Sequence, residues 1–298
     1  MREIIEVNSI YEYIKYIKEY SEKRNDELWY RGQSNNEWKI NPNLFRTAER
    51  RGKADEIVTL SYDFVDFNDE FLKLKEKIIE QNLFNILGLN DFKIMFIAQH
   101  YGLLTPIVDW TIDPLVALFF AIESYTYNDK TYPVVYILKP ELSNKYASIG
   151  RKVGIGEKLE PITEPICIDK MTNELFKSWT KNLNATPANH VPIAIFTNEN
   201  FSHRISKQSG KFTLHGAVGP LNYEWKDIEV EGEKFVDIIK VNPNKVEEIK
   251  GYLKALNITK ESVYVEKLEL DMICKDIKES SLEKFKENID IANTNLRL

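Results

Sequence analysis

The chain has 298 residues, of which 43% are hydrophobic and 12% aromatic, a composition that predicts a globular protein with a substantial buried core. Its 40 basic and 46 acidic residues are mixed along the sequence and leave a net charge of −6, which disfavours non-specific binding to nucleic acid. The two cysteines, Cys167 and Cys274, lie far apart without CxxC spacing and argue against a disulfide framework, and no metal site is predicted.

Membrane association is also not expected. The longest apolar run, Leu115 to Ile122, is far too short to cross a bilayer, and the first six residues contain no apolar signal segment. The sequence therefore predicts a soluble, cytoplasmic protein.

The first predicted elements are a helix and a strand. Ser9 followed by Glu12 is the pattern of a capping box, and apolar residues then recur at helical spacing, which predicts an amphipathic helix over residues 9–23. Residues 28–32, Leu-Trp-Tyr-Arg-Gly, predict a short, half-buried strand. The final glycine of this strand ends it or allows another element to approach the backbone closely.

A loop and two helices are expected next. Residues 33–54 are polar and irregular, which predicts an ordered loop with solvated charges over residues 46–51. The spacing of apolar residues predicts helices over residues 64–87 and 92–101.

The central stretch combines a buried strand with a buried helix. Gly102 can close the preceding helix in the left-handed conformation, and residues 107–111 predict a strand. Asp113 is a favourable N-cap and Pro114 a favourable first residue for the next helix. Because residues 115–122 are all apolar, this helix must be buried on every side.

The remaining chain mixes strands and helices without a regular βαβ alternation. Strands are predicted over residues 133–138, 192–196, 212–215 and 235–241, helices over 172–183, 200–208, 245–256, 262–277 and 281–291, and mostly loop over 141–168. The fold class is therefore α+β, with a single mixed sheet flanked by helices and a helical C-terminal part. We expect a domain over residues 1–215 and a C-terminal extension over 216–298 that packs on it.

Arg31 is the strongest candidate for a ligand-binding residue. A guanidinium at a strand end, followed by glycine, suits bidentate capture of a phosphate or carboxylate. A salt bridge to an acid such as Asp109 explains the same residue equally well.

Asp109, Trp110 and Thr111 are polar groups between a buried strand and a buried helix, which is costly unless they are satisfied or used. On an extended segment Asp109 and Thr111 present a carboxylate and a hydroxyl on one face, and Trp110 faces the other. Alternatively, Thr111 and Asp113 only cap the helix.

His100, Arg204 and Gln208 complete the candidates. His100 is either an acid/base or substrate-binding group or a histidine favoured by the dipole at a helix C-terminus. Arg204 and Gln208 are four residues apart on one helix face before Gly210, and the structural alternative is a C-cap with surface side chains.

Three motifs in order resemble the FRG domain family, named for a Phe-Arg-Gly motif in which Tyr30 replaces the first aromatic residue here. They are Tyr30-Arg31-Gly32-Gln33; Gln99-His100-Tyr101-Gly102-Leu103 running into Asp109-Trp110-Thr111 and Pro114 to Ala121; and Arg204 to Thr213. The resemblance covers about residues 9–215. Members often occur in bacterial genomes and prophages, which implies defence against phage or toxin-like action.

The chain is also distantly similar to ADP-ribosyltransferases. Their sequences carry an arginine on a first strand, a Ser-Thr-Ser-like strand that leads into an Ala-x-x-Phe helix, and a glutamate before a later strand. Arg31 matches the first element, Thr111 with Ala117 and Phe120 the second, and Gln208 stands for the glutamate. A neutral Gln208 binds a ribose hydroxyl but does not stabilise an oxocarbenium charge, a role that Asp109 could supply.

The resemblance implies a pocket that acts on NAD or another nucleotide. Catalytic roles are predicted for Arg31, His100, Asp109, Thr111 and Gln208, and nucleotide contacts for Tyr30, Arg31, Gly32, Gln33, Trp110 and Arg204. The alternative is a non-catalytic module that senses a nucleotide or a protein through the same pocket. A partner is expected to be a small nucleotide or a protein target rather than nucleic acid or a membrane.

Overall fold

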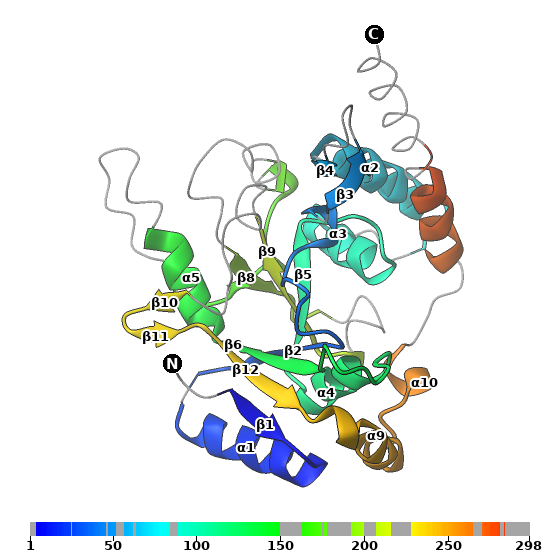
Figure 1. The fold of residues 1–298 in the computed structure, drawn as a ribbon. Helices are drawn as coiled ribbons and strands as arrows, with labels where there is room; N and C mark the ends of the chain where they lie inside the picture. Colours follow the sequence, from blue (N-terminus) through cyan, green and yellow to red (C-terminus); the bar gives the residue numbers. More distant parts are fainter. Residues whose placement is uncertain are drawn as a thin grey trace.

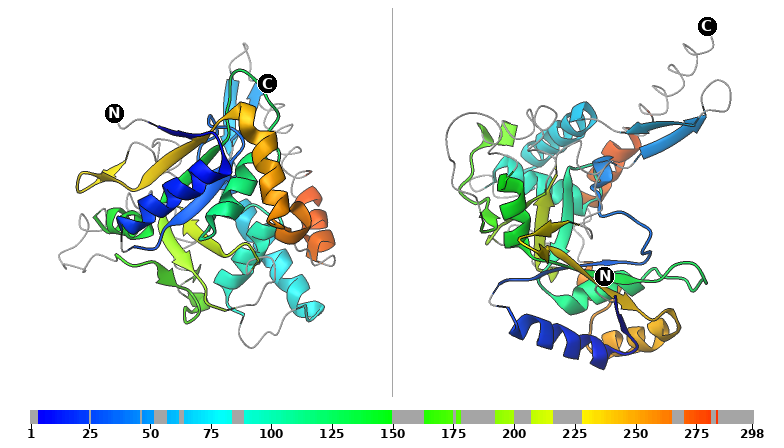
Figure 2. Two further views of the ribbon diagram at one scale, coloured as in Figure 1. Left: turned by 90° about the horizontal axis from the view of Figure 1, so that it is seen from below. Right: turned by 60° about the vertical axis from the view of Figure 1, so that its left-hand side comes forward.

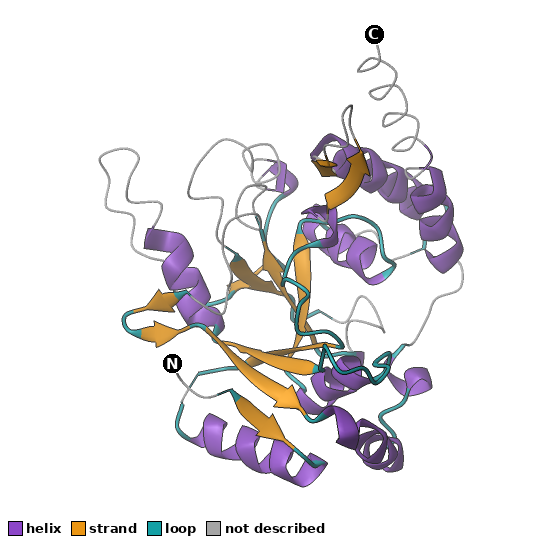
Figure 3. Ribbon diagram, viewed as in Figure 1, coloured by secondary structure: helices purple, strands orange, loops and turns teal. Residues whose placement is uncertain are grey.

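The computed structural model describes residues 4–24, 26–45, 47–51, 57–61, 64–83, 89–149, 163–174, 176–177, 192–199, 207–215, 228–264, 270–280 and 283. Within these residues an eight-stranded mixed sheet lies at the centre and helices surround it (Figures 1 and 3), which confirms the predicted α+β class. No helix among these residues has the length and apolar character needed to cross a membrane.

The strand order of the central sheet is β1-β12-β6-β2-β5-β9-β8-β7. The bounds are Ile5–Val7 for β1, Val236–Val241 for β12, Val134–Leu138 for β6, Trp29–Gln33 for β2, Ile107–Thr111 for β5, Gly210–Leu214 for β9, Ile193–Phe196 for β8 and Ile166–Cys167 for β7. The two outermost pairs, β1 with β12 and β7 with β8, are parallel, and the other neighbours are antiparallel. β12, from the C-terminal part of the chain, thus lies inside the sheet next to the N-terminal strand.

Helices form two apolar layers against the sheet (Figure 1). The helices are α1 (Ile10–Glu22), α2 (Phe64–Glu80), α3 (Asp91–His100), α4 (Pro114–Ile122), α5 (Pro140–Ile149), α9 (Val246–Ala255), α10 (Lys260–Val263) and a helix over residues 270–280, with 3-10 turns η1 (Asn43–Phe45) and η7 (Pro243–Lys245). α1, α4, α9 and α10 share one core cluster with β1, β2, β6 and β12. α2, α3 and helix 270–280 share another cluster with β5, β8 and β9.

The predicted caps lie where the sequence placed them. Ser9 Oγ accepts from the Glu12 amide, 3.1 Å away, but the Glu12 carboxylate accepts from the Asn8 amide rather than from Ser9. Asp113 accepts from the amides of Leu115 and Val116 at the start of α4, and Gly102 has a φ of +79° after α3. Both ends of the central stretch are therefore set by local sequence.

Several predicted boundaries were wrong. Part of the predicted loop over 141–168 is α5, because Ser143 and Asn144 bond to the β8 segment: the Asn144 amide pairs with both backbone groups of Ala194. The helix predicted over 262–277 is interrupted at Tyr264, where α10 ends and the aromatic ring packs against α4. The helix predicted over 64–87 ends at Glu80.

Part of the predicted loop over 33–54 is a strand. β3 (Thr47–Arg51) pairs with β4 (Ile57–Ser61) in a hairpin that projects from the body of the protein (Figure 2). Its charged composition is untypical of a strand, and its backbone pairs with β4 over five residues. A second hairpin joins β10 (Glu229–Val230) to β11 (Glu233–Lys234) through two residues of positive φ.

Other predicted helices are described only in part. Of the helix predicted over residues 172–183, positions 173–174 and 176–177 are helical, and residue 175 and residues 178–183 lie outside the described residues. Residues 200–206 also lie outside them, as do those from 281 onward except residue 283.

The central sheet opens between β2 and β5. These described strands pair only at Tyr30 and Thr111, although β2 pairs with β6, and β5 with β9, over five residues each. Beyond that one pair, Nη1 of Arg31 donates to the carbonyl oxygen of Asp109 at 2.7 Å. A side-chain hydrogen bond thus joins the two strands where backbone pairing has stopped.

Gly32 is the point of closest approach between β2 and α4. A Cβ atom at this position would lie 2.0 Å from the Ala117 carbonyl oxygen and 2.4 Å from the Ala121 nitrogen. Both neighbours are backbone atoms of a buried helix and cannot rotate away. The glycine of the Tyr-Arg-Gly motif is therefore required by packing, which confirms the predicted close approach.

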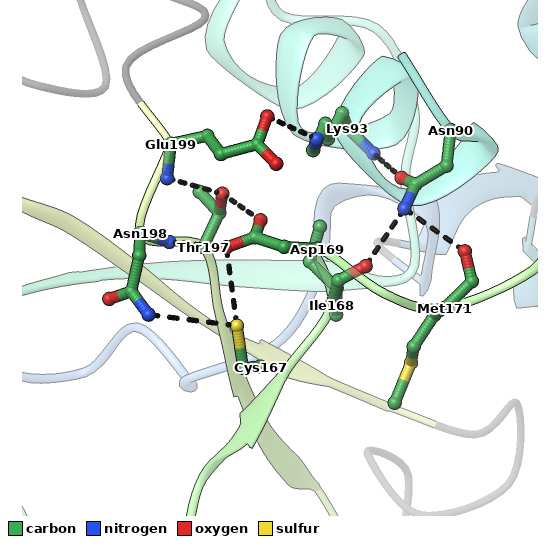
Figure 4. A network of polar contacts seen from close by, with 9 residues as sticks. All are labelled: Asn90, Lys93, Cys167, Ile168, Asp169, Met171, Thr197, Asn198 and Glu199. Atoms are coloured by element: carbon green, nitrogen blue, oxygen red, sulfur yellow. Dashed lines mark hydrogen bonds and ion pairs between the residues drawn. The ribbon is translucent and has the colours of Figure 1, made fainter. Parts of the chain in front are cut away.

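A network of polar contacts anchors the N-terminus of α3 (Figure 4). Asn90 caps the helix at the Lys93 amide and donates to the carbonyl oxygens of Ile168 and Met171. The buried Lys93 ammonium binds Glu199 at 2.5 Å, and the buried Asp91 carboxylate binds Lys75 at 2.6 Å. These contacts hold the helix whose last turn carries Gln99 and His100.

We expect Gly32→Ala to lower the free energy of unfolding by about 3 kcal/mol, because the new methyl group overlaps helix backbone. Urea denaturation followed by circular dichroism measures this loss. Gly251→Ala is the matched control: a Cβ there meets nothing within 4 Å, and alanine in the interior of α9 should add about 0.5–1 kcal/mol. Equal midpoints for Gly32→Ala and the wild type would contradict the packing argument.

Candidate functional site

A cavity of about 300 Å³ lies where the sheet opens between β2 and β5. We call it the cleft. Residues from β2, β5, the C-terminal ends of α3 and α4, and two later segments of the chain surround it. The lining residues are Tyr30, Arg31, Gly32, Gln33, Ser34, Trp38, Gln99, His100, Asp109, Trp110, Thr111, Phe120, Glu123, Ser124, Gln208 and Tyr264.

The cleft brings together the residues that the sequence singled out. The predicted catalytic set of Arg31, His100, Asp109, Thr111 and Gln208 lines it, as do the predicted ligand contacts on β2 and β5. Arg204 lies outside the described residues, so its position stays a prediction. The chemical roles of these side chains remain predictions.

A chain of hydrogen bonds orients the Asp109 carboxylate. Gln99 Nε2 donates to Asp109 Oδ2 at 2.8 Å, and the Thr105 hydroxyl donates to Gln99 Oε1. Nη1 of Arg31 lies 3.9 Å from the same Asp109 oxygen. The salt bridge weighed as an alternative from the sequence is thus present, but it is long, and the guanidinium still lines the cavity.

Two acceptor atoms in the cleft are buried without a hydrogen-bond partner among the described residues. They are Oε1 of Gln33, on β2, and Oδ1 of Asp109, on β5. A buried acceptor that lacks a donor costs free energy, and the cost is removed when a ligand or an ordered water donates to it. The cleft is therefore suited to a ligand that carries hydroxyl or N–H donors.

β5 separates its polar residues as the alternation predicts. Trp110 packs with Val108 in one core cluster, and its Nε1 donates to the buried Thr213 hydroxyl at 2.9 Å. Thr111 accepts from the amide of the N-cap residue Asp113 at 2.9 Å, so of the two residues considered as caps only Asp113 caps α4 itself, and Thr111 also lines the cleft.

Two histidines lie near the cleft in different settings. His100, at the end of α3, is buried against Phe212 with ring centroids 5.6 Å apart and lines the cavity. His215 is fully buried beneath it, 3.0 Å from the Thr213 hydroxyl. Burial, and to a smaller extent the positive charge of Arg31, lower the pKa of His215 to about 3. A neutral His215 is therefore part of the native state.

Gln208 and Tyr264 close the cleft from the later part of the chain. Gln208 is buried and its Nε2 donates to the Val263 carbonyl oxygen at 3.2 Å, so the surface position considered from the sequence was wrong. The Tyr264 hydroxyl donates to Glu123 at 3.0 Å. No sequence pattern pointed to Tyr264 or Glu123, because their contact depends on how α10 folds back onto α4.

Gln99 was also missed as a site residue, although it begins the Gln-His-Tyr-Gly motif. Its position at the end of a helix next to the candidate His100 was the available signal. Among the described residues, no group of three histidine, cysteine or acidic side chains is arranged to hold a metal ion.

The fold and the site define an α+β protein whose mixed sheet opens onto a polar cleft built around an arginine at a strand end. Residues 26–130 match the family model of the FRG domain, so the chain contains an FRG domain. Neither a search of curated proteins nor a search of solved structures found a match. The resemblance to the FRG family is confirmed over a shorter range than expected, and the similarity to ADP-ribosyltransferases stays a prediction.

We expect the unfolding free energy to fall on acidification in a way that depends on His215. Its folded pKa is below its unfolded value of about 6.5, so its contribution is complete above that pH and is lost as the pH falls toward 3. Between pH 7 and pH 5 the loss should be about 2 kcal/mol. His215→Gln lacks this titration, and denaturation at several pH values should give it a flatter profile than the wild type. Parallel profiles would refute this assignment.

Proposed function

We propose that the cleft binds a nucleotide, with Arg31 as the contact for its phosphate, and that the protein acts on NAD or a related nucleotide as ADP-ribosyltransferases do. One observation carries the proposal: the Arg31 guanidinium lies at the opening of the sheet, on the wall of a cavity that also presents the Asp109 carboxylate and the Gln208 amide. A volume of about 300 Å³ is at the lower end of the range usual for small-molecule sites.

The chemistry of the lining residues supports cleavage at a glycosidic bond. In such a reaction the bond between the ribose C1′ and the base nitrogen breaks, and the electron pair leaves with the base. Water or an acceptor nucleophile then bonds to C1′ and releases a proton. Asp109 offers a negative charge for the positive charge that develops on the sugar, and its Oδ1 is a buried acceptor for a hydroxyl. In this proposal Gln208 and Thr111 orient the sugar.

The second candidate is a binding module without turnover. Two contacts favour it: Gln208, in place of a catalytic glutamate, donates to the Val263 carbonyl oxygen, and Asp109 is already bound by Gln99. The same cleft would then sense a nucleotide or a protein. In either case we include in the proposal the role in phage defence or toxin-like action that the family resemblance implies.

We expect purified protein to consume NAD, and Arg31→Gln to reduce the rate by a factor of about 10² or more, because a lost charge-assisted contact weakens phosphate binding and positioning. Chromatographic quantification of NAD and nicotinamide measures the rate. Lys254→Gln changes an exposed residue of α9 that does not line the cleft, so it is the control and should retain full activity. Unchanged turnover in folded Arg31→Gln would eliminate the proposed role of Arg31.

Asp109→Asn separates the two candidate functions. The amide keeps the shape of the carboxylate but not its charge, so we expect NAD turnover to fall by a factor of about 10² with little change in NAD affinity. Calorimetry of NAD binding and measurement of the NAD turnover rate on the same preparation test whether the rate falls while the affinity stays the same. If the wild type gains thermal stability with NAD but does not consume it, the binding module is the correct reading.

A further inference from the structure

A second cavity of about 370 Å³ adjoins the cleft. It shares Arg31, Gln99 and Asp109 with the cleft, so these three side chains form the boundary between the two spaces. Its other polar contributors include Asn41, Asn43 and Lys278. The second cavity thus places the guanidinium of Arg31 within reach of a group on either side.

The floor of the second cavity is held by hydrogen bonds. Asn43 Nδ2 donates to the Leu103 carbonyl oxygen and Asn43 Oδ1 accepts from the Thr105 amide, both at 2.8 Å. The Leu104 amide donates to the buried Glu70 carboxylate at 2.9 Å. The chain between α3 and β5 is therefore fixed before any ligand arrives.

Lys278 reaches the second cavity because of how helix 270–280 packs. Leu270, Cys274 and Ile277 are buried in the core cluster of α2 and α3, which fixes the rotation of the helix. Lys278 follows, and its Nζ lies 3.8 Å from where a Cβ atom on Gly102 would be. Within the part of the chain that the structure describes, no salt bridge joins Lys278 to a carboxylate.

The two spaces differ in formal charge. The cleft is lined by the carboxylates of Asp109 and Glu123 and by one strong base, Arg31. The second cavity is lined by Arg31 and Lys278 and by one carboxylate, Asp109. An anionic group is therefore favoured in the second cavity, and a neutral or cationic group in the cleft.

We propose that the second cavity is a phosphate subsite, in which Lys278 and Arg31 together bind the phosphates of a nucleoside diphosphate or of a molecule that contains one. This inference rests on the proposed function and specifies how the nucleotide is oriented across the two cavities. The nucleoside lies in the cleft, where the buried acceptors of Gln33 and Asp109 meet its hydroxyl groups, and the phosphates cross Arg31 toward helix 270–280.

Calorimetric titration of the full chain with ADP, adenosine and inorganic pyrophosphate tests the subsite. We expect the wild type to bind ADP at least tenfold more tightly than adenosine, and Lys278→Gln to weaken ADP and pyrophosphate by about tenfold without changing adenosine. Lys278→Arg should retain most of the ADP affinity. Lys275→Gln, an exposed lysine of the same helix that lines neither cavity, is the matched control and should behave as the wild type.

The results separate this inference from the proposed function. Equal ADP affinity in Lys278→Gln and the wild type would overturn the subsite, as would wild-type binding of adenosine as tight as that of ADP. Weakened pyrophosphate binding with unchanged ADP binding would show a site for free phosphate only and would also overturn it. ADP binding that depends on Lys278 without any NAD turnover would support the subsite and refute the enzymatic function. Absence of binding by all three compounds would overturn the subsite, and the NAD turnover measurement decides the proposed function separately.

Discussion

The contact between the β2 backbone and helix α4 at Gly32 is the constraint on which the cleft depends. Because no side chain separates them, β2 lies directly on α4, one residue after Arg31. Two residues before this glycine, Tyr30 makes the single pairing between β2 and β5. β2 is thus held by α4 at Gly32 and by β6 along the edge away from β5, and the side chain of Arg31 is left to bridge the gap to β5.

Burial and charge then limit what the cleft can contain. One carboxylate oxygen of Asp109 accepts a hydrogen bond from Gln99, and the other has no partner among the described residues. The carboxylate is therefore held in position, but its hydrogen-bonding capacity is not fully used. His215 stays neutral beneath Arg31, because burial opposes a second positive charge there. The guanidinium of Arg31 is consequently the cation that lines both the cleft and the second cavity. Lys278 adds a positive charge to the second cavity only.

Residues beyond the segment that matches the FRG family model also contribute to the site. Residues 26–130 supply β2, β5, α3 and α4, but Gln208, Tyr264 and Lys278 come from beyond the match. Tyr264 joins α10 to the end of α4 through Glu123, and Gln208 bonds to the backbone of α10. The boundary and most of the lining of the two cavities therefore lie within the matched segment, and later elements add Gln208, Tyr264 and Lys278 to their walls.

Local chemistry in the sequence was enough to determine the caps at Ser9 and Asp113, the left-handed Gly102, the buried helix α4 and the α+β class, because each depends on a few neighbouring residues or on apolar spacing. It also identified most of the cleft, since Arg31, Asp109 and Gln208 stand in three recognisable motifs. Only the tertiary structure decided that α5 forms, that helix 262–277 is interrupted at Tyr264, and that Tyr264 and Lys278 face the cavities. These features arise from contacts between residues distant in sequence, such as Asn144 with Ala194 and Tyr264 with Glu123, which have no periodicity or local signal.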